Sequence, residues 1–253
     1  MSLRIAALPA HPDASFPPVD SALTEPDGLL AHGGDLTPAR LINAYREGIF
    51  PWYSEGEPIL WWSPSGRAVF RTDGVHLSSR FKRSLRTSRV VVRADTCFER
   101  VTSACAQAPR PGQAGTWITP AMQRAYVALH ALGHAHSIEV FDGEVPDGDC
   151  LVGGLYGVVV GRMFCGESMF SVRPGASSVA LASLARRLHG WGWPLIDAQV
   201  PNHHTRRLGV ETWSRPTYVA ALHALRDAPE PAGSWTTRFG EMRATELATP
   251  VPA

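Results

Sequence analysis

The spacing of apolar and polar residues changes near residue 67, which divides the chain into two unlike parts. Before it the sequence is rich in Pro, Gly and Trp, and only DLTPARLINAYREG has a clear helical period. In that stretch Thr37 is suited to cap a helix that starts at Pro38 and is stopped by Gly48. The rest, including IFPWYSEGEPILWWSP, has the short apolar runs and turn residues of brief strands. We therefore expect a small N-terminal α+β domain over residues 1–67.

After this point strand-like and helix-like stretches alternate. RVVVR (89–93) is a short run of β-branched residues, whereas CFERVTSACAQA (97–108) and TPAMQRAYVALHALG (helix at about 120–132) have helical spacing. Three consecutive apolar runs then predict antiparallel strands joined by a polar loop and a tight turn: HSIEVF (136–141), LVGGLYGVVV (151–160) and RMFCGESMF (162–170). The pattern indicates a sheet built from consecutive hairpins.

The next stretches complete the order of elements. ASSVALASLARRLHGWG (176–192) predicts a helix, PLIDAQV (194–200) a strand, and a short helix near NHHTRRLG precedes a last one at about 216–226. Three antiparallel strands followed by a helix and a parallel strand is the order of GNAT-type acyltransferases. We predict an α/β (α+β) protein in which residues 68–253 form a GNAT-like domain with a mixed, mostly antiparallel sheet. The tail from about residue 229 is low in apolar residues, and we expect it to be loosely ordered.

The loop before the predicted central helix bears on the donor. GNAT-type enzymes that use an acyl-coenzyme A carry a Q/R-x-x-G-x-G/A phosphate cradle there, whereas the loop here reads SVRPGASS. It has neither the glycine spacing nor the length of that cradle. We therefore do not expect coenzyme A, and the residues indicate no other cofactor.

Composition limits the class of protein and the class of partner. The chain has 253 residues, 44% of them hydrophobic, and a net charge of +1, so bulk charge does not indicate an anionic partner. One stretch nevertheless carries basic residues without an acidic one: Arg80, Lys82, Arg83, Arg86, Arg89 and Arg93. Such a run is either a solvated helix face or a patch that binds phosphates, and the sequence leaves both readings open.

Targeting signals and cysteine spacing bear on the compartment. The N-terminus lacks the basic and apolar regions of a signal peptide, and no apolar run approaches the ~20 residues that span a membrane. The four cysteines have no CxxC spacing, which indicates reduced thiols rather than disulfides or a metal site. We expect a cytoplasmic, monomeric protein that does not bind a membrane.

Two patterns that resemble catalytic sites fail on spacing. His130, His134 and His136 are close in LHALGHAH, but a glycine ends the helix between the first two and HExxH is absent. We therefore expect structural or surface histidines and no metal. Ser168 lies in GESMF, which lacks the G-x-S-x-G of a nucleophile elbow and has strand on both sides. A metal enzyme and a serine hydrolase are both disfavoured.

The strongest chemical signal is a pair of polar residues in an apolar strand. Asp197 and Gln199 in LIDAQV are two positions apart, so their side chains should point to the same face. Glu167 interrupts the apolar run RMFCGESMF, where an unpaired carboxylate is unfavourable. Two carboxylates and an amide that meet in an apolar cleft would suit capture of a cationic amine. The alternative is a hydrogen-bond network within the core.

Several stretches together resemble the leucyl/phenylalanyl-tRNA–protein transferase family: EPDGLLAHGGDL, AYREGIFPWYS, PILWWSP, GTWIT, LHALGHAHSIEV, LVGGLYGV, FCGESMFS and LIDAQV. The resemblance covers residues from about 16 to 215, in the family's order. It implies a small N-terminal domain and a GNAT-like C-terminal domain. It also implies an enzyme that moves Leu, Phe or Met from aminoacyl-tRNA to the N-terminal Arg or Lys of a protein, which marks that protein for N-degron proteolysis.

The resemblance further implies roles for individual residues. The catalytic group would be Glu167, Asp197 and Gln199. The slot for the aminoacyl side chain would be formed by Leu155, Phe164, Met169, Ser171, Leu184, Leu188 and Ile196. Aromatic residues near the cleft, the first of them stacked on the terminal adenosine, would be Trp52, Tyr45, Trp117 and Tyr126. Leu184 and Leu188 stand where some members have phenylalanine, so the preference among Leu, Phe and Met stays open.

The chemistry of such a transfer needs few groups. The donor ester is already activated, so no ATP, metal or covalent intermediate is required. We expect Gln199 and Asp197 to orient the acceptor amine, and Glu167 to be paired only by a substrate with a basic first residue. The tRNA would be held through its phosphates by Arg80, Lys82, Arg83 and Arg86. Two alternatives stay open: a tRNA-dependent aminoacyltransferase with a non-protein acceptor, and a non-catalytic RNA-binding module.

Overall fold

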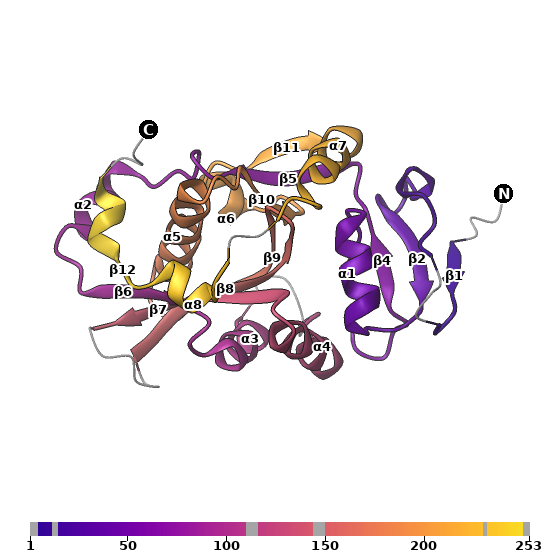
Figure 1. Cartoon of the computed structure of the whole chain (residues 1–253), viewed down its shortest axis with the longest axis horizontal. Coiled ribbons are helices and arrows are strands. Elements are labelled where there is room, and N and C mark those ends of the chain that lie inside the picture. Colours follow the sequence, from indigo (N-terminus) through magenta and orange to yellow (C-terminus); the bar gives the residue numbers. More distant parts are fainter. Residues whose placement is uncertain (1–4, 12–14, 110–115, 144–149, 230–231, 250–253) are drawn as a thin grey trace.

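The N-terminal part of the chain forms a small sheet with a helix packed against it. The computed structural model describes residues 5–11, 15–109, 116–143, 150–229 and 232–249. The strand order is β1 (Ala6–Leu8), β2 (Leu29–Gly33), β4 (Leu60–Trp62) and β3 (Phe50–Pro51), and a 3-10 turn, η1 (Val19–Ser21), precedes β2. Helix α1 (Pro38–Arg46) begins as predicted, because the Thr37 side chain accepts a hydrogen bond from the Arg40 N–H. The helix lies between this sheet and the rest of the molecule (Figure 1).

A larger sheet forms the body of the molecule. Over the described residues its order is β11 (Glu211–Ser214), β5 (Gly66–Arg71), β10 (Leu195–Gln199), β9 (Met163–Ser171), β8 (Leu151–Val160), β7 (Ala135–Asp142), β6 (Val90–Ala94) and β12 (Met242–Arg243). Strands β9 and β10 run parallel, and the other neighbouring strands of this sheet run antiparallel. The predicted mixed, mostly antiparallel sheet is therefore confirmed.

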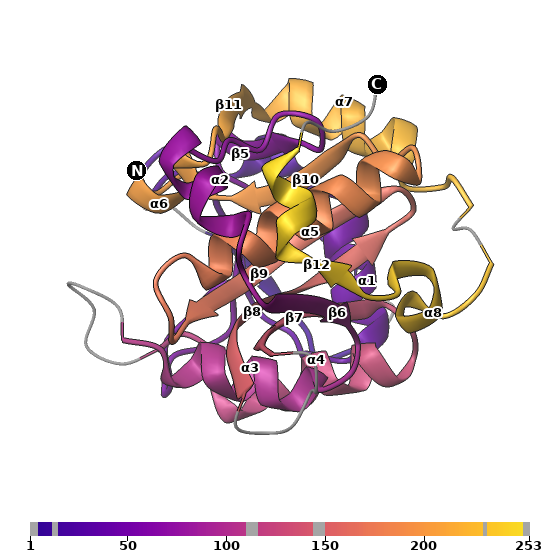
Figure 2. The same ribbon diagram turned by 90° about the vertical axis from the view of Figure 1, so that its left-hand side faces the viewer.

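Helices cover both faces of the larger sheet. Helix α5 (Ala176–Gly190) crosses one face, and α3 (Phe98–Gln107) and α4 (Pro120–Ala131) cover the other (Figure 2). Strand β8 contributes to both sides: Leu155 packs into the core with α5, whereas Tyr156 packs into the core with α3 and α4. Successive side chains of a strand point to opposite faces, so burial of both faces explains the continuous apolar run of β8.

Three further helices are α2 (Ser79–Leu85), α6 (His203–Arg207) and α7 (Arg215–Leu225). None of the helices in the described part of the chain is long and apolar enough to cross a membrane. The small sheet is built within residues 6–62, and the first strand of the larger sheet starts at Gly66. The division into domains at residue 67 stays a prediction.

The segment after residue 229 is ordered over its described residues, 232–249, and the prediction of a loose tail is wrong there. It forms α8 (Trp235–Phe239), the strand β12 and the 3-10 turn η3 (Ala244–Ala248). Trp235 and Phe239 are buried, and β12 pairs with β6. Apolar residues are sparse in this segment, but most of them are directed into the core, so a small number suffices to anchor it.

Candidate active site

The parallel strands β9 and β10 separate inside the larger sheet, and a cavity lies where they part. Their pairing runs from Met163 opposite Leu195 to Cys165 opposite Asp197. Beyond that point β9 continues to Ser171 with β8 as its neighbour. The cavity has a volume of about 890 Å³ and is bounded by β9, β10, the first turns of α5, the end of β3 and α6.

Gln199 lines the cavity in an unusual backbone conformation. Its φ is 55°, in the left-handed region that residues other than glycine rarely adopt, and the pairing of β10 with β5 shifts register there. Two hydrogen bonds hold it: its backbone N–H donates to Asp197 Oδ1 at 2.9 Å, and its side-chain Nε2 donates to Glu167 Oε1 at 2.6 Å. The bond to Glu167 fixes the amide, and its oxygen Oε1 can then accept a hydrogen bond from a substrate.

Asp197 lies at the base of the cavity and is bound by the protein. It is fully buried, and Arg67 donates to both of its oxygens, from Nε to Oδ1 at 2.8 Å and from Nη2 to Oδ2 at 2.7 Å. The Tyr218 hydroxyl donates to Oδ2 at 2.9 Å. These donors, together with the Gln199 N–H, occupy the carboxylate. The expectation that Asp197 stands beside Gln199 and orients an amine does not match this geometry, because the positive φ and the register shift turn the two side chains to different partners.

Arg67 is a site residue that the sequence analysis missed. It is fully buried, donates from Nη1 to the Gly48 carbonyl at 2.9 Å, and lies over the rings of Phe50 at 4.8 Å and Tyr218 at 4.4 Å. Burial would lower the pKa of the guanidinium, but the charge of Asp197 outweighs it and raises that pKa. The only signal in the sequence was a basic residue inside the apolar stretch GRAVF.

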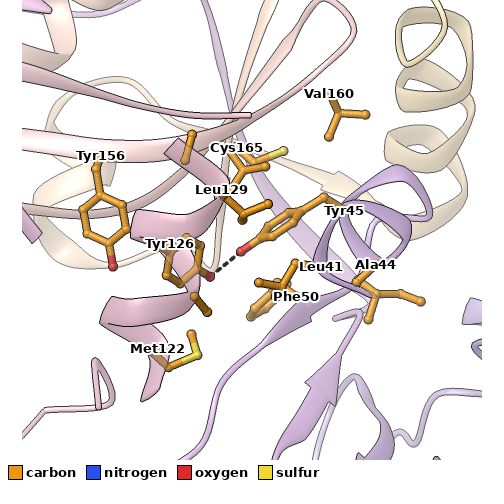
Figure 3. Packing of buried hydrophobic residues seen from close by; sticks show 14 of the residues in the cluster. Leu41, Ala44, Tyr45, Phe50, Met122, Tyr126, Leu129, Tyr156, Val160 and Cys165 are labelled. Carbon is orange, nitrogen blue, oxygen red and sulfur yellow. Dashed lines mark hydrogen bonds between the residues drawn. The ribbon is translucent and has the colours of Figure 1, made fainter. Parts of the chain in front are cut away.

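Glu167 has permanent partners, so the expectation that only a substrate pairs with it is wrong. Its Oε2 accepts a hydrogen bond from the Tyr126 hydroxyl at 2.6 Å, and its Oε1 accepts from the Gln199 amide. The Tyr126 hydroxyl is in turn bonded to that of Tyr45 at 2.6 Å, which links α4 to α1 (Figure 3). Burial raises the pKa of Glu167 to about 7, against the lowering effect of its hydrogen bonds. A carboxyl group with this pKa can exchange a proton near neutral pH.

The structure brings together most of the residues assigned to the substrate. The aminoacyl slot is represented in the cavity lining by Leu155, Phe164, Met169, Ser171, Leu184 and Ile196, and the aromatic residues by Trp52 and Trp117. Three assigned residues are buried outside the lining: Leu188, Tyr45 and Tyr126. The two tyrosines instead support Glu167 from behind. Lining residues that the sequence analysis did not name include Phe70, Leu181, Ser178, His204 and Arg207.

The basic run begins on α2, beside the first turn of α5. No ion pair among the described residues includes Arg80, Lys82, Arg83 or Arg86. Helix α2 meets α5 at Phe81, whose ring would lie 2.6 Å from a Cβ atom added to Gly175. The end of the run differs, because Arg93 pairs with Glu241. The hypothesis of a phosphate-binding patch therefore concerns the basic residues of α2 and Arg86, which directly follows that helix.

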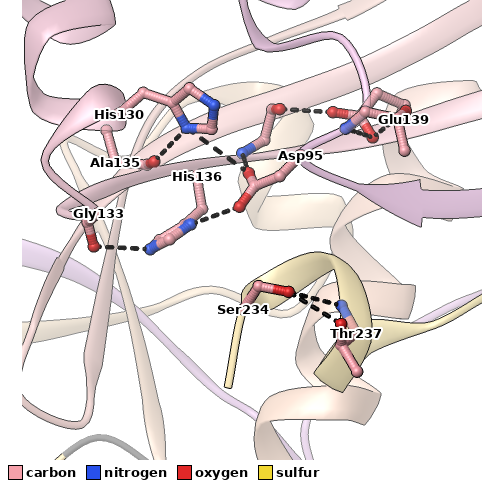
Figure 4. Close-up of polar contacts among 10 residues, drawn as sticks. Asp95, His130, Gly133, Ala135, His136, Glu139, Ser234 and Thr237 are labelled. Atoms are coloured by element: carbon pink, nitrogen blue, oxygen red, sulfur yellow. Dashed lines mark hydrogen bonds and ion pairs between the residues drawn. The ribbon is translucent and has the colours of Figure 1, made fainter. Parts of the chain in front are cut away.

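Asp95 brings together two of the three histidines of LHALGHAH (Figure 4). His136 Nδ1 lies 2.7 Å from Asp95 Oδ2, and His130 Nδ1 lies 3.9 Å from Asp95 Oδ1. Each ring also bonds a backbone carbonyl, His136 Nε2 that of Gly133 at 3.1 Å and His130 Nδ1 that of Ala135 at 2.8 Å. These hydrogen bonds link the end of α4 to the start of β7 and to Asp95.

Known proteins match the chain over nearly its whole length. Residues 69–223 match the family described as leucyl/phenylalanyl-tRNA protein transferase, and residues 34–65 match that family's N-terminal domain. A protein of Xanthomonas euvesicatoria named leucyl/phenylalanyl-tRNA–protein transferase is 62% identical over 244 residues, or 96% of each chain. One of the same name from Xylella fastidiosa is 57% identical over 236 residues, or 93% of this chain and 95% of that one.

Among solved structures, the crystal structure of FemX is similar at a TM-score of 0.42 and 11% identity, over 73% of this chain and 71% of that chain. This likeness is too distant to bear on function. The family matches, over residues 34–65 and 69–223, include all the residues that line the cavity, and the relatives are more than half identical to this chain. The chain belongs to the leucyl/phenylalanyl-tRNA–protein transferase family.

Proposed function

We propose that the cavity between β9 and β10 is where an aminoacyl ester of tRNA meets the N-terminal amine of an acceptor protein. The enzyme transfers Leu or Phe from aminoacyl-tRNA to the N-terminal Arg or Lys of a protein, and we include Met among its donors. One observation carries the placement of the site. The amide of Gln199, fixed by Glu167 on its side chain and by Asp197 on its backbone, borders the same cavity as the apolar slot.

The reaction is the aminolysis of an ester. The acceptor nitrogen bonds to the carbonyl carbon, the bond from that carbon to the ribose oxygen breaks, and a proton from the nitrogen ends on the ribose oxygen. An N-terminal α-amine has an ordinary pKa of about 8, so it must lose a proton before it attacks. The ester supplies the free energy, and the protein has to hold the two reactants in line, which can contribute on the order of 7 kcal/mol to lowering the barrier.

Two residues face the acceptor in this proposal. Gln199 Oε1 accepts a hydrogen bond from the amine and orients its lone pair toward the ester. Glu167, with its pKa of about 7, can take up the amine's proton, and its negative charge favours a first residue with a guanidinium or ammonium group. Asp197 and Arg67 act indirectly, because they hold the backbone of Gln199 and do not touch the substrate.

The donor side chain enters the apolar slot. The flexible thioether of Met169 lets the slot adapt to side chains of different shape. An apolar pocket distinguishes side chains by only about 1–3 kcal/mol per methylene, which fits a set that includes Leu, Phe and Met. Trp52, 39% exposed at the cavity, offers a ring face to the terminal adenine. The unpaired cations of α2 would hold phosphates of the acceptor stem.

The wider setting is part of the same proposal. Charged tRNA is made and used in the cytoplasm, and the four cysteines have no CxxC spacing, which fits a reducing compartment. We propose a cytoplasmic monomer with domains at residues 1–67 and 68–253. Its product would enter N-degron proteolysis, because the transferred Leu or Phe becomes the new first residue of the acceptor.

A transfer assay tests the proposal. Charged Leu-, Phe- and Met-tRNA are offered with peptides that begin with Arg, Lys or Ala, and product is followed by mass. The Arg and Lys peptides should be extended and the Ala peptide should not. Gln199→Ala should lower kcat about 100-fold, the size of a lost acid–base or orienting group. Gln199→Asn should lower kcat less, because asparagine keeps an amide and tolerates the left-handed backbone. Transfer to a non-peptide amine in preference to the Arg peptide would instead identify an aminoacyltransferase with a non-protein acceptor.

A further inference from the structure

The first turn of α5 opens onto the cavity. Gly175 precedes the helix with a φ of 86° and supplies no capping side chain. Three serines of this region line the cavity, namely Ser171, Ser177 and Ser178. The Ser177 N–H is already bonded to Ser171 Oγ at 2.8 Å. A helix of 15 residues carries partial positive charge at this end, where its first N–H groups lack partners within the helix.

Ser178 differs from its neighbours because its donors have no partner. It is only 8% exposed and lines the cavity. Among the described residues, neither its backbone N–H nor its hydroxyl makes a hydrogen bond. The Ser178 hydroxyl is not enclosed by protein atoms and Ser178 lines the cavity, so these two donors are available to a ligand there.

Positive charge gathers at the same end of the cavity. Arg207 of α6 lines the cavity, is exposed, and has no acidic partner in the part of the chain that the structure describes. His204 also lines it, with Nε2 3.5 Å from Ser177 Oγ. Arg207 follows His204 by three residues on α6, so the two side chains are neighbours on the surface of that helix. The acidic group of the cavity, Glu167, lies four residues before Ser171 on β9, about 13 Å away along an extended strand.

We propose that Ser178, His204 and Arg207, at the N-terminus of α5, form an anion subsite that binds the 5′-phosphate of the 3′-terminal nucleotide of the donor tRNA. The proposal rests on the proposed function, because it requires an aminoacyl nucleotide in the cavity. Backbone N–H groups at a helix N-terminus, a hydroxyl and a guanidinium are the groups that bind phosphate.

The two reactants explain why the cavity separates its charges. The terminal nucleotide carries its ester on the ribose 3′-oxygen and its phosphate on the 5′-carbon, so the two groups occupy different parts of the cavity. The acceptor brings a cationic amine and a basic side chain, which suit the end with Glu167. The end with Ser178 and Arg207 would repel that cation and attract the phosphate.

The test compares two minimal donors that differ by one phosphate. They are leucine esterified to the 3′-oxygen of adenosine and leucine esterified to the 3′-oxygen of adenosine 5′-monophosphate. Transfer to a peptide that begins with Arg is measured over a range of donor concentrations. The phosphate should lower KM about tenfold, the size of one charge-assisted hydrogen bond, at similar kcat. Adenosine 5′-monophosphate should likewise inhibit transfer from charged tRNA about tenfold more strongly than adenosine does.

Variants locate the effect. In the wild type the KM of the donor without the phosphate should exceed that of the donor with it. Ser178→Ala and Arg207→Gln should each reduce this ratio by about threefold. Ser178→Asp, which places a carboxylate at the subsite, should make the two KM values equal. Arg206→Gln is the matched control, because Arg206 is exposed on the same short helix but does not line the cavity. It should keep the wild-type ratio.

Three results would overturn the subsite. Equal KM values for the two donors, with equal inhibition by adenosine and its monophosphate, would remove it and leave the proposed function standing. Equal effects of Arg206→Gln and Arg207→Gln would reduce it to general attraction between charges. No transfer from either ester or from charged tRNA would remove the proposed function and the subsite together.

Discussion

The carboxylate of Asp197 holds the backbone of Gln199, two residues further along β10, in a left-handed conformation. Its Oδ1 accepts the Gln199 N–H at 2.9 Å, and Gln199 has a φ of 55°. A non-glycine residue in this region is strained by about 1–3 kcal/mol and persists only where its surroundings enforce it. Asp197 can enforce it because Arg67 binds both of its oxygens. The hydrogen bonds that connect Arg67 to Asp197 and Asp197 to Gln199 therefore set the direction in which the Gln199 amide points.

Removal of Asp197 should destabilise the fold as well as the reaction. Asp197→Ala would leave the buried guanidinium of Arg67 without its counter-ion, so we expect the free energy of unfolding to fall by about 3–5 kcal/mol. Tyr218→Phe removes only one hydrogen bond to the same carboxylate and should cost about 1 kcal/mol. Denaturation in urea measures both values. Wild-type stability in Asp197→Ala would contradict the support role, whether or not transfer is lost.

Stability should fall as the pH rises toward neutrality because of Glu167. Its pKa is raised from 4.5 to about 7 in the folded protein, so the folded state keeps a proton that the unfolded state releases between these values. The free energy of unfolding should therefore decrease from pH 4.5 to about 7, by up to about 3 kcal/mol, and change no further above it. In Glu167→Gln this contribution should vanish, and unfolding measured at pH 5 and pH 8 would show a smaller difference than in the wild type.

Glu139 provides a matched control for the pH dependence of transfer. It is fully buried outside the cavity lining, and burial raises its pKa to about 7 as well. Glu139→Gln should flatten the stability profile as Glu167→Gln does. The transfer rate should rise as the pH passes 7, because Glu167 must be deprotonated to take up the amine's proton. Only Glu167→Gln should remove this rise and narrow the preference for Arg over Ala peptides. Equal pH–rate profiles for the two variants would place the titrating group elsewhere.

Donor preference should depend on Leu184 and not on its neighbour one turn along α5. Leu184→Ala enlarges the cavity and should shift the ratio of kcat/KM for Phe over Leu upward by about tenfold, within the ~1–3 kcal/mol that an apolar pocket can supply. Leu188→Ala removes an equally buried side chain that lies outside the lining. Both changes should cost about 2–5 kcal/mol of stability. A shift of donor preference in Leu188→Ala of the same size would show that core packing, and not the slot, sets the preference.

Binding of charged tRNA should weaken with salt through the cations of α2. Each phosphate contact that is lost should flatten the slope of log affinity against log salt by roughly 0.7–0.9. The double change Arg80→Gln and Arg83→Gln should therefore flatten the slope and raise KM for charged tRNA, with little effect on leucyl-adenosine. Arg124→Gln, exposed on α4, is the control. An unchanged slope in the double variant would leave the run as a solvated helix face.

Local patterns in the sequence determined the secondary structure and the family. Helical period, capping threonines before proline, and apolar runs predicted α1, α4, α5 and the hairpins from β7 to β9, because each of these signals acts within a few residues. Glu167, Asp197 and Gln199 stood out as polar residues in apolar strands, whereas the residues of the aminoacyl slot were named from the resemblance to the family. The tail was misjudged because its apolar residues are few, although they reach the core.

Only the tertiary structure decided what these residues do. Asp197 meets Arg67 across 130 positions of sequence, Glu167 meets Tyr126 across 41, and neither pairing leaves a periodic signal in the chain. Strand alternation predicted that the side chains of Asp197 and Gln199 stand side by side. In the structure Gln199 has a positive φ, its backbone N–H donates to Asp197, and its side-chain amide donates to Glu167. The sequence determines which groups are present because propensity and periodicity are local. Their roles follow from burial, which makes each buried charge or donor depend on a partner that folding brings from elsewhere.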